Sequence, residues 1–321
     1  MPSPGIFLSK PVECDLSPPP GFTRHRRRRR RPGLRWAGGR AQFERARSAR
    51  STFHPLRCSS WIVRSLAAEN ALLLAFLVTA LAPLGLLAQE PKNQLSIAAA
   101  ADLVYCLEEL NRDFAKANPG VKVKVSTGSS GNFFAQIKNG APFDLFMSAD
   151  MNFPRQLARE GLADESSLTS YGIGRIVLWT VKDGIAVSRG LAVVTDPAIH
   201  KLALANPDHA PYGRAAKAAL EHQKLWEGIR EKIVLGENVA QTAQFVQTGH
   251  ADAGIVALSL VLSPVLAKVG RYAEIPPDFH PALEQGAVIT SHGANNPLAK
   301  RYMDFLRSAK ARGILDRYGF R

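Results

Sequence analysis

The sequence predicts an α/β protein with two lobes and a cleft between them, and three observations lead to this fold class. From residue 95 onward, short apolar runs alternate with amphipathic segments, the pattern that builds parallel sheets covered by helices. A length of 321 residues suits about two domains. An apolar share of 46% is enough to bury a core in each of them.

Basic residues are concentrated before this globular part. Residues 1–88 hold 15 Lys and Arg against 4 Asp and Glu, which leaves 26 against 23 in a chain of net charge +14. We interpret residues 1–62, with six arginines at 26–31, as a basic extension that is disordered or that reflects a misplaced start. A nucleic-acid-binding arm is the alternative, but no basic fold with interleaved aromatic residues follows it.

Residues 63–88 have the layout of a secretory signal peptide. One Arg precedes an apolar run, and the small residue Ala88 stands before Gln89. A retained membrane anchor is the alternative, because residues 71–88 approach the length that spans a bilayer. Both readings place the rest of the chain in the periplasm or another extracytoplasmic space. Cys106 is the only cysteine after residue 88, so we expect no internal disulfide there.

The first lobe is expected from residues 89–174 together with residues 287–321. Its opening strand, 95–101, leads through Asp102 into a helix that carries Leu103, Leu107, Leu110 and Phe114 on one face. The elements expected next are a half-exposed strand at 121–125, a loop at 127–131, a helix at 132–138, a strand at 144–149 and a helix at 153–159.

The second lobe is expected from residues 175–286. Apolar runs predict its strands at 175–181, 201–205, 232–235 and 253–258. A strand at 287–293 and a helix at 297–308 then return to complete the first lobe. Because the chain crosses twice between the lobes, they can hinge around a cleft.

Four junctions between loops and helices are candidate binding positions. In open α/β sheets, ligands bind beyond the carboxyl ends of the strands, where helices begin. Free backbone N–H groups and the helix dipole favour an anion there. The hydroxyl of Ser130 adds another donor. The junctions lie at residues 101–102, 128–131, 211–213 and 238–239.

Asp102 needs a separate argument, because a carboxylate in an anion site repels the ligand. As an N-cap, its side chain would accept the N–H of Val104 or Tyr105 and leave its own N–H for the ligand. We favour this role. The alternative is that Asp102 accepts a proton from a partly protonated oxoanion such as hydrogen phosphate.

Several segments in order resemble the molybdate-binding proteins of bacterial molybdate ABC transporters, over about residues 94–320. They are IAAAADL, STGSSGNFFAQIKNGAPFDLFMSAD, ANPDHAPYGRAAKAAL, GENVAQTAQFVQTGHADAGIVALSL and the final RYGF. The resemblance implies a two-lobed type II periplasmic binding protein fold. It also implies that molybdate or tungstate is held in the cleft by uncharged hydrogen bonds.

Matching the family's binding motifs places ligand contacts at Asp102, Ser130, Tyr212 and Val239. Further candidates are Ala101, Ser129 and Ala257. The chain departs from the family at two of these positions. Many members have Ser where this chain has Asp102, and some have Tyr where it has Ala257, which removes a possible donor.

The resemblance implies a monomeric receptor that passes the oxoanion to the membrane permease of an ABC transporter. No cofactor is expected, and molybdenum enters only within the bound oxoanion. Another oxoanion such as phosphate or sulfate is an alternative ligand. A regulator that joins a ligand-sensing domain to a basic DNA-binding arm is an alternative of a different class, although no helix-turn-helix pattern precedes residue 90 and no nucleic-acid partner is expected.

Catalysis is not expected. The loop GSSGN departs from the nucleophile pattern G-x-S-x-G at Asn132. No nucleotide loop of the type G-x-x-x-x-G-K appears, and the six histidines from His200 to His292 lack metal-ligand spacing.

Overall fold

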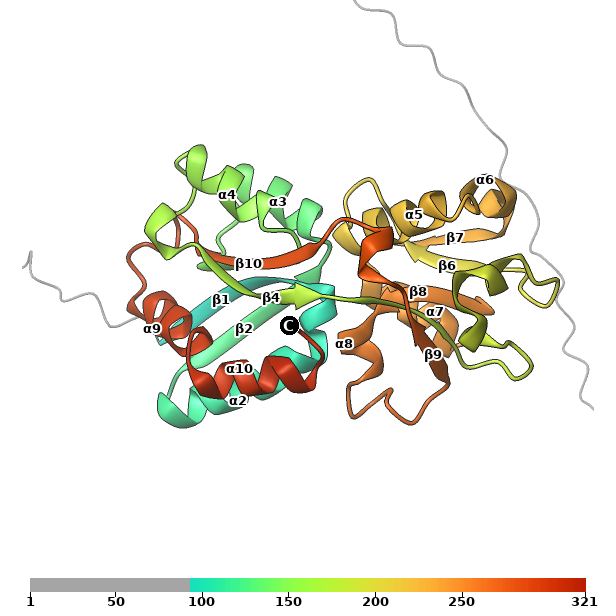
Figure 1. Cartoon of the computed structure of the whole chain (residues 1–321). Helices are drawn as coiled ribbons and strands as arrows, with labels where there is room; N and C mark the ends of the chain where they lie inside the picture. The colour runs from blue at the N-terminus through green and yellow to red at the C-terminus, as the bar shows by residue number, and fades with distance from the viewer. Residues whose placement is uncertain (1–92) are drawn as a thin grey trace, which may run out of the picture. The chain divides into compact units, whose positions relative to one another are not determined.

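The computed structural model describes residues 93–321, which form two five-stranded sheets with helices on both faces (Figure 1). The first sheet has the strand order β2-β1-β3-β10-β4. Strands β1, β2 and β3 are parallel, and β10 runs antiparallel to both β3 and β4. Its strands are β1 (Gln94–Ala100), β2 (Lys122–Gly128), β3 (Leu145–Ser148), β4 (Thr169–Gly174) and β10 (Leu283–Ile289).

Two separate cores cover the faces of this sheet. Phe146, Val288 and Ala98 point to the face that α3 and α4 cover, where Phe133 and Leu157 pack against them. Their sheet neighbours Ile97, Leu145 and Met147 point to the opposite face, in keeping with the period of two along a strand. The helices of the first lobe are α2 (Val104–Ala117), α3 (Ser130–Lys138), α4 (Asn152–Arg159), α9 (Pro297–Leu306) and α10 (Ala309–Arg317), with 3₁₀ turns η2 (Ala101–Leu103) and η3 (Glu165–Ser167).

The second sheet has the order β7-β6-β8-β5-β9 and its own core. Its strands are β5 (Ile176–Thr180), β6 (Leu202–Ala205), β7 (Ile233–Gly236), β8 (Ala253–Ala257) and β9 (Arg271–Glu274). Its helices are α5 (Pro211–His222), α6 (Trp226–Ile229), α7 (Val239–Gln247) and α8 (Leu258–Val261), with 3₁₀ turns η4 (Val187–Thr195), η5 (Arg230–Lys232) and η6 (Pro277–Phe279).

The chain passes between the sheets twice. It leaves the first sheet at Gly174 and enters the second at Ile176, with only Arg175 between the two strands. It returns between β9 and β10, where antiparallel β10 enters the first sheet between β3 and β4. The predicted two-lobed α/β fold class is confirmed.

The predicted return strand at 287–293 was wrong in its position, because β10 begins at Leu283 and ends at Ile289. The start of the strand was not recognised because Glu284 and Gln285 are polar and interrupt the apolar pattern. They belong to the strand nevertheless, because they pair with Ile173 and Gly172 of β4, and a register shift follows between Gln285 and Gly286. Residues 291–295 form a turn instead.

Helix α2 holds Cys106, whose side chain is buried and free. Burial, followed by the nearby Asp102 and Glu109 carboxylates, raises the pKa of this thiol far above its usual range. Within residues 93–321, no helix is long and apolar enough to cross a membrane. The predicted basic extension at 1–62 and signal peptide at 63–88 lie outside the described residues.

Candidate functional site

A small cavity lies where both lobes meet. Its volume is about 10 Å³ for the centre of a water-sized sphere, about the space that one water molecule needs. The first lobe contributes the ends of β1, β2 and β3, and the second lobe contributes the starts of α5 and α7. The lining residues are Ala100, Ala101, Asp102, Gly128, Ser129, Ser130, Ala149, Ala210, Pro211, Tyr212, Asn238 and Val239.

Three helices begin at this cavity. Helix α3 starts at Ser130, α5 at Pro211 and α7 at Val239. The N–H groups in the first turn of a helix have no acceptor within that helix. Pro211 has no N–H of its own and occupies the position where none is needed, so Tyr212 carries the first donor of α5. Backbone donors from both lobes therefore face one small space.

Asn238 determines which donor of α7 stays available. Its side chain caps the helix by accepting the N–H groups of Ala240 and Gln241, at 3.1 and 3.0 Å. The N–H of Val239, which precedes them, is not used by this cap. The cap thus fixes the start of α7 and leaves Val239 as its donor at the cavity.

Ser130 is almost fully buried, and a backbone N–H group of the same lobe orients its hydroxyl. The backbone N–H of Ala149 donates to the Oγ of Ser130 at 3.0 Å. Because this bond uses only a lone pair, the hydroxyl hydrogen of Ser130 remains available for a ligand. Ser130 follows β2 and Ala149 follows β3, so the two strands on either side of β1 together position this one donor.

Ser129 does something different from its neighbour, because its hydroxyl joins the two lobes. Its Oγ donates to the carbonyl of His209 at 2.6 Å and lies 2.9 Å from the Nδ1 of that residue. The N–H of Gly131 reaches the same carbonyl at 3.0 Å. A Cβ at Gly131 would lie only 2.5 Å from that oxygen, so glycine permits the close approach.

A second pair of contacts joins the lobes on the side of α4. Arg214 on α5 forms an ion pair with Asp150 at 2.7 Å and lies over the ring of Phe153, 5.5 Å from its centroid. Arg214 and His209 were not among the predicted site residues. Both lie in the segment around the start of α5, but nothing in the sequence links them to partners more than 50 residues away.

Asp102 lies inside the 3₁₀ turn η2, and its side chain is 1% exposed. Its Oδ2 accepts the hydroxyl of Tyr212 from the other lobe at 2.9 Å. Its Oδ1 is buried and has no hydrogen-bond partner among the described residues. Ser259 on α8 donates to the backbone carbonyl of Asp102 at 2.7 Å, which fixes the turn.

The predicted N-cap role of Asp102 was wrong. Neither η2 nor α2 has a side-chain cap, because the helical turn already begins at Ala101 and places Asp102 within it. The carboxyl group is instead drawn to the Tyr212 hydroxyl. An N-cap precedes the first helical residue, and a sequence does not show where a short 3₁₀ turn shifts that start.

Burial dominates the electrostatics of this pair. Burial raises the pKa of Asp102 to about 7, although the Tyr212 hydroxyl and the N–H groups of Asp102 and Leu103 oppose the increase. Burial, and then the neighbouring Asp102, also raise the pKa of Tyr212 well above its usual value, so its hydroxyl stays protonated and donates. None of the twelve lining residues in the described part of the chain is Lys or Arg.

The structure brings most of the predicted site residues together. Asp102, Ser130, Tyr212 and Val239 all line the cavity, as do Ala101 and Ser129. Ala257 does not, because it ends β8 and is fully buried. Ala149 was missed, although it ends the strand predicted at 144–149, beside β1, and so could have been found from the strand-end rule. Within residues 93–321, no group of three or more His, Cys, Asp or Glu side chains could hold a metal ion.

Several known proteins are similar to this chain. The family model for bacterial extracellular solute-binding proteins matches residues 95–321. The molybdate-binding protein ModA of Azotobacter vinelandii is 37% identical over 227 residues, which is 71% of this chain and 89% of that protein. ModA of Rhodobacter capsulatus is 33% identical over 237 residues, covering 74% of this chain and 92% of that protein.

The solved structures show the same likeness. The periplasmic molybdate-binding protein of Azotobacter vinelandii superposes with a TM-score of 0.67 at 35% identity, and the match covers 71% of this chain and 98% of that one. The resemblance seen in the sequence is confirmed. The chain belongs to the family of bacterial extracellular solute-binding proteins.

Proposed function

We propose that this protein is an exported receptor that captures molybdate or tungstate and delivers it to the permease of an ABC transporter. One observation carries the proposal: the cavity between the lobes is lined by first-turn backbone N–H groups and the free hydroxyl hydrogen of Ser130. The similar proteins that are named for molybdate binding support it.

The donors match the chemistry of a tetrahedral oxoanion. Such a dianion carries only acceptor oxygens, so it needs donors from several directions. Helix N-termini supply them together with a favourable dipole, without a Lys or Arg that would bind many other anions. We assign ligand contacts to the hydroxyl of Ser130 and to the N–H groups of Tyr212 and Val239, with Asp102 completing the set.

The other candidate residues have lesser roles in this proposal. Ala101 shapes the wall, and Ser129 acts on the closing of the lobes rather than on the ligand, because its hydroxyl is already bonded to His209. Ala257, fully buried at the end of β8, is outside the set.

We infer that the contacts between the lobes describe the closed form. In this form the Ser129 and Gly131 bonds to His209 lie on one side of the cavity, and the Arg214–Asp150 pair lies on another. Opening would break these bonds and admit the oxoanion, and closing would exclude competing water. The closed surface is then the one that the permease recognises.

The division into lobes belongs to the same proposal. The expected lobes were residues 89–174 with 287–321, and residues 175–286. Because β10 of the first sheet begins at Leu283, we place the second crossing before that residue. The single residue between β4 and β5 makes that crossing a natural hinge.

We further propose that the protein acts outside the cytoplasm, as a monomer, without catalysis and without a cofactor. The similar proteins are named as binding proteins, and one is named as periplasmic. Among the described residues that line the cavity, Asp102 has the one carboxyl group, and the others offer hydrogen-bond donors or apolar walls.

The test is a calorimetric titration of the purified protein with molybdate, tungstate, sulfate and phosphate at matched salt and neutral pH. Tight binding of molybdate or tungstate, with sulfate and phosphate weak or silent, is expected. The Ser130→Ala variant should lose about 1.5–3 kcal/mol of binding free energy, the value of a hydrogen bond to a charged group. Preference for phosphate or sulfate would mean that this anion, and not molybdate or tungstate, is the ligand. Silence from all four anions, or salt-sensitive DNA binding instead, would overturn the proposal.

A further inference from the structure

Asp102 is the one acidic group among the donors that line the cavity, and only one of its oxygens is used. Oδ2 accepts the hydroxyl of Tyr212, whereas Oδ1 is buried and has no partner among the described residues. A buried polar atom without a partner is costly, and a site that leaves one beside its ligand space points to the ligand as the missing partner.

The two protonation states of Asp102 predict opposite behaviour at this atom. An ionised carboxylate would present a second negative charge to a dianion and could offer Oδ1 only as an acceptor, which a molybdate oxygen cannot use. A neutral carboxylic acid keeps Oδ2 as the acceptor for Tyr212 and turns Oδ1 into an O–H donor. Only the neutral state satisfies both oxygens when the oxoanion is bound.

We propose that Asp102 is protonated in the loaded protein and donates its Oδ1–H to the bound oxoanion, so that capture of each dianion takes up one proton. This inference rests on the proposed function. The proton comes from solvent, stays on Asp102 while the ligand is bound, and returns to solvent on release.

The surroundings of Asp102 favour the neutral form. Burial already raises its pKa to about 7 before any ligand charge is added. A dianion at hydrogen-bond distance raises the pKa of a carboxyl group further, because two like charges resist being close together.

Among residues 93–321, no charged side chain next to Asp102 offsets this increase in its pKa. Helices α7 and α8, which pack on the η2 turn, contain no titratable residue, and β2 carries its two lysines, Lys122 and Lys124, before the end that meets the turn. The titratable groups around Asp102 are Tyr212 on α5, Tyr171 on β4 and Cys106 on α2, and all three have raised pKa values that keep them neutral. Arg214, two residues after Tyr212, is paired with Asp150 instead.

The consequence is a binding affinity that depends on pH in one direction. Between the pKa of Asp102 in the free protein and its higher value in the complex, the affinity for a dianion falls about tenfold for each unit of pH increase. Hydrogen phosphate would behave differently, because its own O–H can donate to an ionised Asp102, so its binding needs no proton from solvent. The pH dependence therefore separates the two roles that Asp102 can have.

The experiment is titration of the full protein with molybdate, and in parallel tungstate, from about pH 6.5 to about pH 9, in pairs of buffers with different ionisation enthalpies. The difference in heat between the buffers of each pair gives the number of protons taken up. The expected result is close to one proton per site at the alkaline end, with the dissociation constant rising about tenfold per pH unit.

Two variants separate donation from mere packing. Asp102→Asn keeps a donor at this position without a titrating group, so its affinity should not depend on pH, should involve no proton uptake, and should exceed that of the wild type at about pH 9. Asp102→Ala should also lose the pH dependence but bind more weakly than Asp102→Asn, because it has no donor. Circular dichroism of both variants shows whether they fold.

The outcomes also distinguish this inference from the proposed function. If the wild type binds molybdate with constant affinity and no proton uptake over the whole range, or more tightly as pH rises, the inference is wrong and the receptor function stands. If neither the wild type nor Asp102→Asn binds any oxoanion at any pH, the proposed function itself fails. Because the proton count is measured on the wild type, it remains decisive even if a variant does not fold.

Discussion

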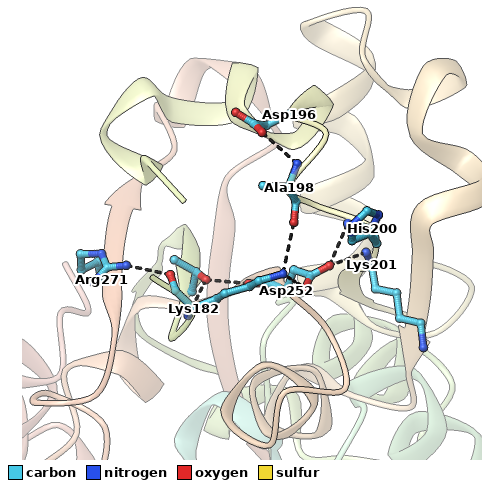
Figure 2. Close-up of polar contacts among 8 residues, drawn as sticks. Lys182, Asp196, Ala198, His200, Lys201, Asp252 and Arg271 are labelled. Atoms are coloured by element: carbon cyan, nitrogen blue, oxygen red, sulfur yellow. Dashed lines mark hydrogen bonds and ion pairs between the residues drawn. The ribbon is translucent and has the colours of Figure 1, made fainter. Parts of the chain in front are cut away.

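Asp102 and Asp252 are two partly or fully buried aspartates in the same chain, and their surroundings move their pKa values in opposite directions. The Asp102 side chain accepts the Tyr212 hydroxyl from the other lobe, has no cationic partner among the described residues, and has a raised pKa of about 7. Asp252 lies within the second lobe, where Lys182 pairs with it at 2.8 Å and the N–H groups of His200 and Lys201 donate at 2.8 and 2.9 Å (Figure 2).

The difference teaches that burial alone does not decide the charge of a carboxylate. Burial raises the pKa of Asp252 as well, but Lys182 and the two N–H groups outweigh it, and the net pKa is lowered. The Asp252 side chain is 17% exposed and both of its oxygens are satisfied. Asp252 thus ties one lobe together as an anion, whereas the environment of Asp102 is completed only when the lobes meet.

The largest expected effect is a pH dependence of stability that comes from Asp102. Between about pH 4 and about pH 7 the folded protein keeps a proton on Asp102 that the unfolded chain releases, so the free energy of unfolding falls as pH rises and levels off above the folded pKa. The fall attributable to this residue is about 4 kcal/mol at most. Urea denaturation of the wild type and of Asp102→Asn across this window measures it. Parallel curves for the two proteins would show that Asp102 does not titrate in this way.

The pH dependence of stability that comes from Asp252 should have the opposite sign, and the Asp252→Asn variant tests it. Because the pKa of Asp252 is lowered, its contribution is present at neutral pH and is lost as pH falls through the folded value. We expect the variant to lower the free energy of unfolding at neutral pH by about 1.5–3 kcal/mol, the range for hydrogen bonds to a charged group. The difference from the wild type should shrink in acid. A stabilised variant would mean that the three donors do not compensate for burial.

A glycine substitution tests whether the Asp102 region depends on the meeting of the lobes. The Cβ of Gly131→Ala would lie 2.5 Å from the His209 carbonyl, so it should weaken oxoanion binding by about 1–3 kcal/mol while leaving the unfolding transition almost unchanged. Gly313→Ala is the matched control, because its Cβ would meet no atom within 4 Å. Calorimetry measures the oxoanion affinity of both variants. Equal affinities would show that the contact between Gly131 and His209 plays no part in ligand binding.

The smallest expected effect is that of Lys182→Met, which removes one partner of Asp252. The lysine side chain is 47% exposed, so water screens the pair and the loss should stay below about 1 kcal/mol. The backbone donors of His200 and Lys201 would keep Asp252 ionised. Chemical denaturation at low and high salt checks this, and a loss as large as that of Asp252→Asn would show that the ion pair dominates.

Much of the fold could be predicted from local pattern. The apolar strands β1, β3, β5, β6 and β8 were placed within a residue or two, and the buried face of α2 was read correctly from Leu103 to Phe114. Strand β4 was missed because Gly172 and Gly174 weaken its pattern. The missing side chains leave room for Phe320 beside Gly172 and for the Tyr212 hydroxyl beside Gly174, contacts that no local window contains.

The site, like the fold, has features that local pattern predicts and features that depend on long-range contacts. Positions such as Ser130 and Val239 could be predicted because a loop before a helix is visible in the sequence, and the backbone donor needs no particular side chain. The state of Asp102 could not, because its partner Tyr212 is 110 residues away and its burial is created by the other lobe. Long-range pairing decided the chemistry of this residue, and capping preference did not.

The burial of Cys106 has a consequence for life outside the cytoplasm, where we propose that this protein works. Disulfide exchange requires a thiolate at the surface, and this thiol is both enclosed by α2 and its neighbours and held in its protonated form. In an oxidising compartment, Cys106 would therefore form no mixed disulfide and would not cross-link one copy to another. An unpaired cysteine, usually a hazard for a secreted protein, is chemically silent at this position.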